Sequence, residues 1–95
     1  MKNPKTFGVW GNIEKDAFWN VLPKIINWAK DKNLELFLTE KIISDVRAKE
    51  FDQPVINSKE KISEMDFMLV LGGDGTFLSC ARAVENRLTP ILGIH

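Results

Sequence analysis

Cysteine, net charge and long apolar runs are what this sequence of 95 residues has little of. The single cysteine, Cys80, excludes an internal disulfide, and its place in a helical pattern predicts a small packed side chain with no redox role. The 13 basic residues balance the 13 acidic ones, and no run of Lys and Arg is long enough for a nucleic-acid footprint. We therefore expect no nucleic-acid partner.

No apolar stretch approaches the length of a membrane span, and the apolar segment Thr6 to Trp10 is too short for the core of a signal peptide. These absences predict a cytoplasmic protein without a membrane partner. The length allows one domain, residues 1–95, with a modest hydrophobic core. It is short for an enzyme.

Residues 67–84, with the sequence FMLVLGGDGTFLSCARAV, contain the most informative pattern. The apolar run Phe67 to Leu71 predicts a strand buried on both faces, and Thr76 to Val84 predicts a helix. Between them, three glycines among residues 72–75 allow positive φ and bring backbone N–H groups close to a ligand. Because the following helix offers unpaired donors and the positive end of its dipole, this segment predicts a phosphate-binding site.

Asp74 is the residue of this segment that indicates chemistry. A carboxylate would repel a bare phosphate, so Asp74 either accepts a proton from an attacking hydroxyl or holds a magnesium ion that shields the phosphates. Both roles imply phosphoryl transfer from a nucleoside triphosphate to a hydroxyl. The structural alternative is a tight Asp-Gly turn with a solvated aspartate. Two better-known nucleotide loops are excluded, because Leu78 replaces the third glycine of the dinucleotide fingerprint and the chain lacks the Gly-Lys-Ser/Thr of a P-loop.

Strand and helix patterns alternate along the rest of the chain. Strands are expected at 6–10, 34–39, 67–71 and 90–94, and helices at 16–32 and 76–85. Pro23 predicts a kink or an early break near Trp19. Residues 40–65 are undecided: short helices, one anchored by Ile42, Ile43 and Val46 and one capped by Ser58, compete with a solvated connection.

This alternation predicts an α/β fold, a three-layer α/β/α Rossmann-like arrangement of flavodoxin type with a mostly parallel sheet of about four strands. If the strand order is 2-1-3-4, the sheet changes direction between the first and third strands, and a ligand binds at their carboxyl ends. Asn12, which follows the first strand, would then contact a nucleotide or phosphate. The alternative for Asn12 is a turn or helix-cap residue.

The segment GGDGT, residues 72–76, resembles the shared signature of the superfamily that contains NAD kinases, diacylglycerol and sphingosine kinases, and phosphofructokinases. The lipid kinases typically continue into an acidic and asparagine-rich pattern, whereas Phe77-Leu78 and Ala81-Arg82 look like NAD kinases. Residues 90–94, PILGI, look like the strand that precedes an Asn-Leu-Gly segment in that family. The resemblance is close over residues 66–94 and loose elsewhere.

The resemblance implies magnesium-dependent phosphoryl transfer from ATP or polyphosphate to the adenosine ribose 2′-hydroxyl of NAD, which gives NADP. Asp74 would be the proton acceptor, with a further role as a magnesium ligand, and Gly75 would contact the dinucleotide. Ser79 stands at a position that is basic in some members and touches the substrate. The other residues expected to bind nucleotide are Gly72, Gly73 and Thr76, on the phosphate-donor side, and Phe77.

NAD kinases carry a second, β-rich domain with an Asn-Glu motif, and they close the active site between the domains and often between subunits. That domain is absent from these 95 residues. We therefore expect a truncated N-terminal domain of a homo-oligomeric protein, a dimer or tetramer, which alone binds weakly and does not catalyse. Two alternatives stay open: a lipid kinase domain that uses the same segment, and a non-enzymatic nucleotide- or phosphate-binding module.

Overall fold

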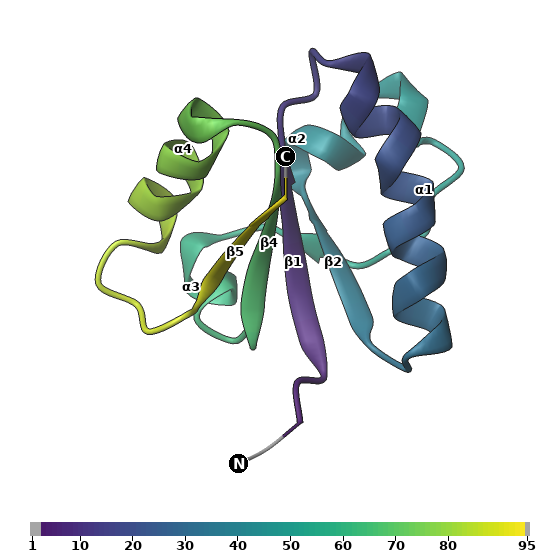
Figure 1. Cartoon of the computed structure of the whole chain (residues 1–95). Coiled ribbons are helices and arrows are strands. Elements are labelled where there is room, and N and C mark those ends of the chain that lie inside the picture. The colour runs from purple at the N-terminus through teal and green to yellow at the C-terminus, as the bar shows by residue number, and fades with distance from the viewer. Residues whose placement is uncertain (1–2, 95) are drawn as a thin grey trace.

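The computed structural model describes residues 3–94 and shows a central sheet with helices on both faces (Figure 1). The strands are β1 (Thr6–Gly11), β2 (Glu35–Thr39), β3 (Val55–Ile56), β4 (Phe67–Leu71) and β5 (Ile91–Ile94). The helices are α1 (Asp16–Asp31), α2 (Glu40–Ile43), α3 (Lys59–Ile62) and α4 (Asp74–Val84), with a 3-10 turn, η1 (Val46–Ala48), after α2. Within the described range, none of the helices has the length and apolar character needed to cross a bilayer.

The sheet is parallel throughout, with the strand order β3-β2-β1-β4-β5. The four predicted strands occur as β2-β1-β4-β5, so the order assumed for the ligand position is present, and the α/β prediction is confirmed. The sequence pattern does not predict β3, which extends the sheet beside β2 through a pairing of Thr39 with Ile56. A strand of two residues is too short to show an alternation of apolar and polar side chains.

Alternation of side chains along the strands divides the core into two clusters, one on each face of the sheet. Phe7 and Val9 of β1 pack on the side of α1, together with the fully buried Leu22 of that helix. Met68 of β4 packs on the other side with Cys80 of α4. Cys80 is fully buried, as predicted, and desolvation raises the pKa of its thiol to about 11, so the thiol stays protonated near neutral pH.

Helix α1 is continuous although Pro23 lies inside it, so the alternative of an early break near Trp19 is wrong, and the alternative of a kink stays a prediction. An interior proline costs a helix about 3 kcal/mol, whereas burial of one large apolar side chain contributes about 1.5–3 kcal/mol. One stripe of α1 buries several such side chains against the sheet, which outweighs the lost hydrogen bond. The buried residues are Phe18, Leu22, Ile26 and Ala29.

The undecided segment, residues 40–65, contains short helices instead of a solvated connection. Ile42 is fully buried and anchors α2. The Ile42 N–H donates to Oγ1 of Thr39 at 3.4 Å, so Thr39 caps the first turn of α2. Ser58 caps α3 as predicted. Val46 is 76% exposed, so its predicted role as a core anchor is wrong. Apolar character alone did not distinguish these two positions, because neighbouring residues in short turns face different sides.

Ile42→Ala should lower the free energy of unfolding by about 2–5 kcal/mol, because it removes a large side chain from a closed core. Val46→Ala, the matched control at an exposed position, should change it by less than about 0.5 kcal/mol. Urea denaturation of both variants followed by circular dichroism measures the difference. Equal losses of stability would contradict the position of α2 in the core.

Candidate functional site

The carboxyl ends of β1 and β4 lie side by side, because the register of these two strands pairs Gly11 with Leu71. The β1–α1 loop therefore leaves the sheet next to the GGDGT segment, residues 72–76. Helix α1 then covers one face of the sheet, and α4 covers the other (Figure 1). Such a change of direction at the carboxyl edge is where open parallel sheets bind ligands.

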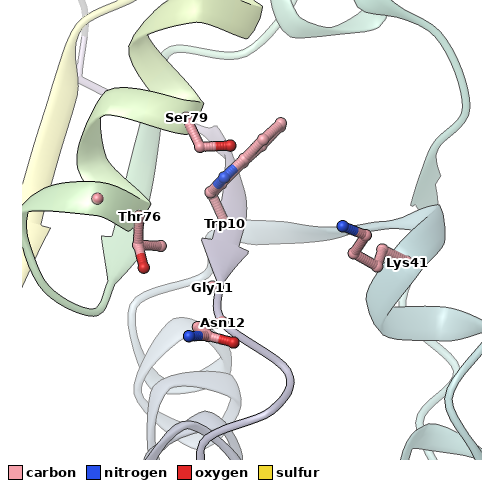
Figure 2. Close-up of a pocket in the computed structure, with 7 residues that line it drawn as sticks. Trp10, Gly11, Asn12, Lys41, Thr76 and Ser79 are labelled. Carbon is pink, nitrogen blue, oxygen red and sulfur yellow. The ribbon is translucent and has the colours of Figure 1, made fainter.

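A cavity of about 580 Å³ opens at this edge of the sheet (Figure 2). This volume lies within the range of about 300–1,000 Å³ that small-molecule sites occupy. The polar groups on its wall include the Lys41 ammonium, the Asn12 amide and the hydroxyls of Thr76 and Ser79. Of the residues that the structure describes, none with a carboxylate side chain lines it. The full lining is Trp10, Gly11, Asn12, Lys41, Gly75, Thr76 and Ser79. This wall suits an anion.

Helix α4 begins with Asp74, earlier than the predicted start at Thr76. Gly73 is its N-cap, and the Phe77 N–H closes the first turn on the Gly73 carbonyl at 3.0 Å. The amides of Asp74, Gly75 and Thr76 precede this bond, so they have no partner inside the helix. Since Gly75 and Thr76 line the cavity, unpaired donors and the positive end of the helix dipole lie at its wall.

Among the three glycines of the segment, positive φ occurs at Gly72 alone, with a value of 151°. Gly73 and Gly75 therefore do not use the positive φ that glycine allows. A Cβ atom on Gly72 would also lie 2.8 Å from Oγ1 of Thr76, while one on Gly73 or Gly75 would meet nothing within 4 Å. The Gly72 N–H donates to the carbonyl of Ile94 at 3.1 Å, which ties the segment to β5. Gly72 thus shapes the turn, and Gly75 leaves open space beside the cavity.

Asp74 is exposed at the start of α4 and does not line the cavity, although the next residue, Gly75, does. Phe77 points elsewhere, since its ring lies 3.2 Å from where a Cβ on Gly93 of β5 would be. The predicted binding residues thus divide into two groups. Those on the cavity wall are Asn12, Gly75, Thr76 and Ser79, and those outside it are Gly72, Gly73, Asp74 and Phe77.

Trp10 and Lys41 line the cavity, and neither is among the predicted site residues. Trp10 stands at the carboxyl end of β1, directly before Gly11-Asn12. Because a ligand is expected at this end of the strand, the position of Trp10 could have identified it as a site residue. Lys41 was harder to find, because it reaches the cavity only through the position of α2 beyond β2. Figure 2 shows its side chain directed toward the cavity from the side opposite Thr76 and Ser79.

Asn12 closes a turn in the β1–α1 loop. Its Oδ1 accepts the N–H of Glu14 at 3.0 Å. The N-cap of α1 is Lys15, so the predicted role of Asn12 as a helix cap is wrong, and the alternative of a turn residue is confirmed. This turn leaves Asn12 on the cavity wall.

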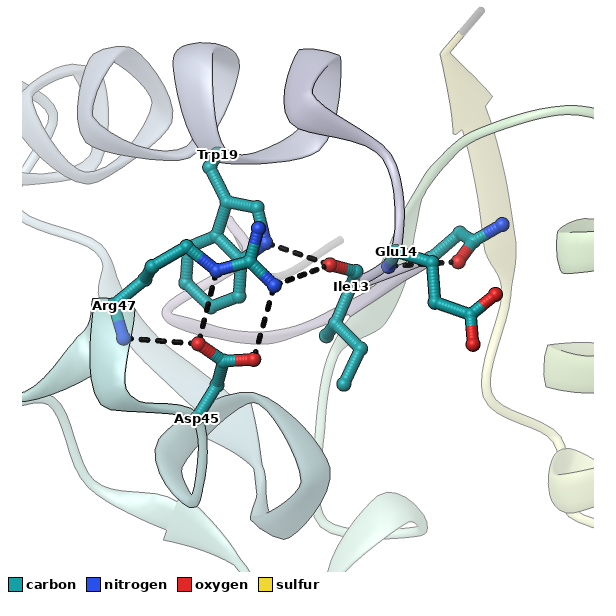
Figure 3. A network of polar contacts seen from close by, with 6 residues as sticks. Ile13, Glu14, Trp19, Asp45 and Arg47 are labelled. Atoms are coloured by element: carbon teal, nitrogen blue, oxygen red, sulfur yellow. Dashed lines mark hydrogen bonds and ion pairs between the residues drawn. The ribbon is translucent and has the colours of Figure 1, made fainter.

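A polar network also holds the β1–α1 loop, through its residue Ile13 (Figure 3). The carbonyl of Ile13 accepts the Nε1–H of Trp19 at 2.8 Å and the Nη2–H of Arg47 at 2.9 Å. The Arg47 guanidinium lies over the Trp19 ring, 4.6 Å from its centroid, and donates to both carboxylate oxygens of Asp45. These side-chain bonds, helped by the Arg47 backbone N–H, hold the pKa of Asp45 below its usual value. The network joins η1 to the loop that carries Asn12.

The chain is similar to known proteins of one family. The family described as the ATP-NAD kinase N-terminal domain matches residues 7–95. The chain belongs to the NAD kinase family. The NAD kinases of Caldanaerobacter subterraneus subsp. tengcongensis and Syntrophotalea carbinolica are each 34% identical to it, and each match covers 96% of this chain. The chain spans 31% of the length of these two relatives.

A solved structure of yeast NADH kinase complexed with NADH resembles the fold, with a TM-score of 0.79 and 15% sequence identity. The likeness covers 98% of this chain and 30% of the yeast chain. At this identity it supports the α/β architecture alone. Together with the family match, it identifies the fold as that of the N-terminal part of an NAD kinase.

Gly72→Ala should destabilise the protein by about 1–3 kcal/mol, because alanine avoids this φ and its Cβ would press on Thr76. Gly75→Ala is the matched control within the same segment. It should leave stability unchanged or raise it by up to about 1 kcal/mol, since it replaces a helical glycine with open space around it. Thermal denaturation measures both, and a larger loss for Gly75→Ala would refute the assignment of the strained position.

Arg47→Lys keeps the charge but loses the planar fork that bonds Asp45 and Ile13 together. Exchange of the Trp19 indole N–H with solvent should therefore become roughly fivefold faster, as measured by NMR. In the unaltered protein, this protection should persist above the usual titration range of aspartate and be lost as the pH falls through the lowered pKa of Asp45. Unchanged exchange in the variant would show that the network does not hold the loop.

Proposed function

We propose that this chain is the phosphate-binding domain of an NAD kinase, which transfers a phosphoryl group from ATP or polyphosphate to the adenosine ribose 2′-hydroxyl of NAD. The observation that carries the proposal is the cavity at the carboxyl edge, where the start of α4 presents unpaired amides on a wall without carboxylates. Membership of the NAD kinase family supports NAD as the acceptor in preference to a lipid. The chain spans 31% of the length of the two NAD kinases named above, so the activity is proposed for a protein of their full length.

Phosphoryl transfer needs little covalent chemistry from the protein, and depends on positioning and on stabilisation of the phosphate charge. The amides of Gly75 and Thr76, with the hydroxyls of Thr76 and Ser79, would bind phosphate oxygens in the cavity. Asp74 stands beside this wall in the first turn of α4, and its exposed carboxylate would accept the proton of the acceptor hydroxyl.

Magnesium fits this arrangement as an ion held mainly by the substrate. Within residues 3–94, no three His, Cys, Asp or Glu side chains gather into a group that could hold a metal. Mg²⁺ in phosphoryl-transfer sites is commonly bound by one or two carboxylates together with substrate phosphates. Asp74 would supply a carboxylate, and the bound ion would neutralise charge on the phosphate oxygens.

Asp74→Asn in the full-length protein should reduce NADP formation by roughly 100- to 10,000-fold, because it removes the proton acceptor. The melting temperature should not change, since the Asp74 side chain is exposed. Asp31→Asn, an exposed aspartate at the end of α1, is the control and should retain full activity.

An enzymatic assay of NADP with ATP and with polyphosphate as donors measures these effects. Near-normal turnover of Asp74→Asn would remove Asp74 from the mechanism. If the unaltered full-length protein made no NADP with either donor but still bound nucleotide, the non-enzymatic binding module would replace the kinase.

A further inference from the structure

Lys41 is placed opposite the start of α4 by the way α2 packs. Thr39 caps α2 directly after β2, and Ile42 turns into the core, where it is fully buried. Lys41, the residue before Ile42, is exposed, and it lies on the cavity wall together with Thr76 and Ser79 of α4. Figure 2 shows its ammonium group extended toward the cavity from the far side.

Among residues 3–94, no group pairs with the ammonium group of Lys41. The ion pairs of the described residues 3–94 involve other cations, namely Arg47, Lys59 and Lys61. Lys41 has no side-chain hydrogen bond within the same range, and no carboxylate shares the cavity wall with it. A lysine in this setting is a mobile point charge on a flexible stem, free to meet an anion that enters the cavity.

We propose that Lys41 binds the linked phosphates of the phosphoryl donor inside this cavity, a role that rests on the proposed kinase function. The two sides of the cavity can bind neighbouring phosphates of the donor. The amides at the start of α4 bind one phosphate, and the Lys41 ammonium on the opposite wall binds another. A nucleoside triphosphate and an inorganic polyphosphate share this chemistry.

The position of Asp74 favours the donor over the dinucleotide as the occupant. The acceptor hydroxyl must lie against Asp74, which accepts its proton, and Asp74 is outside the cavity wall. In an in-line transfer the donor stands on the other side of the transferred group from the acceptor. The donor phosphates therefore lie in the cavity, on the side of Lys41, and NAD approaches from outside it.

The test compares Lys41→Gln with Lys24→Gln in the full-length protein. Lys24 is an exposed lysine of α1 that does not line the cavity, so this variant removes the same charge away from the cavity. Calorimetric titration with a non-hydrolysable ATP analogue and with inorganic tripolyphosphate, both with magnesium, gives the affinities. Steady-state kinetics give KM for the donor and for NAD separately.

Lys41→Gln should weaken binding of both phosphate probes by about five- to tenfold and raise KM for the donor by a similar factor, with KM for NAD unchanged. Lys41→Arg should restore affinity to within about twofold, and Lys24→Gln should change it by less than about twofold. Weakening of the ATP analogue alone, or of tripolyphosphate alone, would support the site and identify its natural donor.

Equal affinities of Lys41→Gln and Lys24→Gln for both probes would overturn the role of Lys41 and leave the kinase function standing. An effect of Lys41→Gln on KM for NAD alone would overturn it too. If the unaltered protein formed no NADP, while Lys41→Gln still weakened binding of the phosphate probes, the kinase function would be refuted instead.

Discussion

The parallel pairing of β1 with β4 is the constraint on which the site depends. Its register runs from Phe7 with Phe67 to Gly11 with Leu71, and it brings together two loops that are about 60 residues apart in the chain. A slip of one residue would turn the β1 side chains Phe7 and Val9 to the wrong face, so both core clusters resist it. The core and the cavity are therefore fixed by the same contacts.

The opposite edge of the sheet sets this register. The Asp66 carboxylate, just before β4, accepts the N–H groups of Lys5 and Thr6 at 2.7 and 3.0 Å, and the Asp66 N–H donates to the Thr6 carbonyl. Farther along β1, Gly8 leaves no room for a side chain, since a Cβ there would lie 2.7 Å from the sulfur of Met68. Hydrogen bonds fix the start of the two strands, and a close contact fixes their middle. Together they allow β1 and β4 a single register.

Features that depend on neighbouring residues could be predicted from the sequence, whereas features that depend on distant contacts could not. Short apolar runs predicted four of the strands, and GGDGT predicted the turn beside the cavity, because these signals are local and strong. The role of Val46 was misjudged and that of Lys41 was missed. In segments as short as α2 and η1, the direction of a side chain depends on packing against distant residues. The continuity of α1 through Pro23 likewise depends on burial that no local propensity describes.

The proposed attraction of this site for phosphate is a matter of arrangement, because the chain as a whole carries no net charge. A neutral protein exerts little field at long range, and exposed charges are screened within about 10 Å at moderate ionic strength. Discrimination must then arise inside the cavity, where the Lys41 ammonium and the first amides of α4 face a space without carboxylates. Acidic residues are as numerous as basic ones along the chain, but among residues 3–94 none lies on this wall, and Asp74 lies just beyond it. This separation would keep the proposed phosphate-binding surface apart from the proposed proton acceptor.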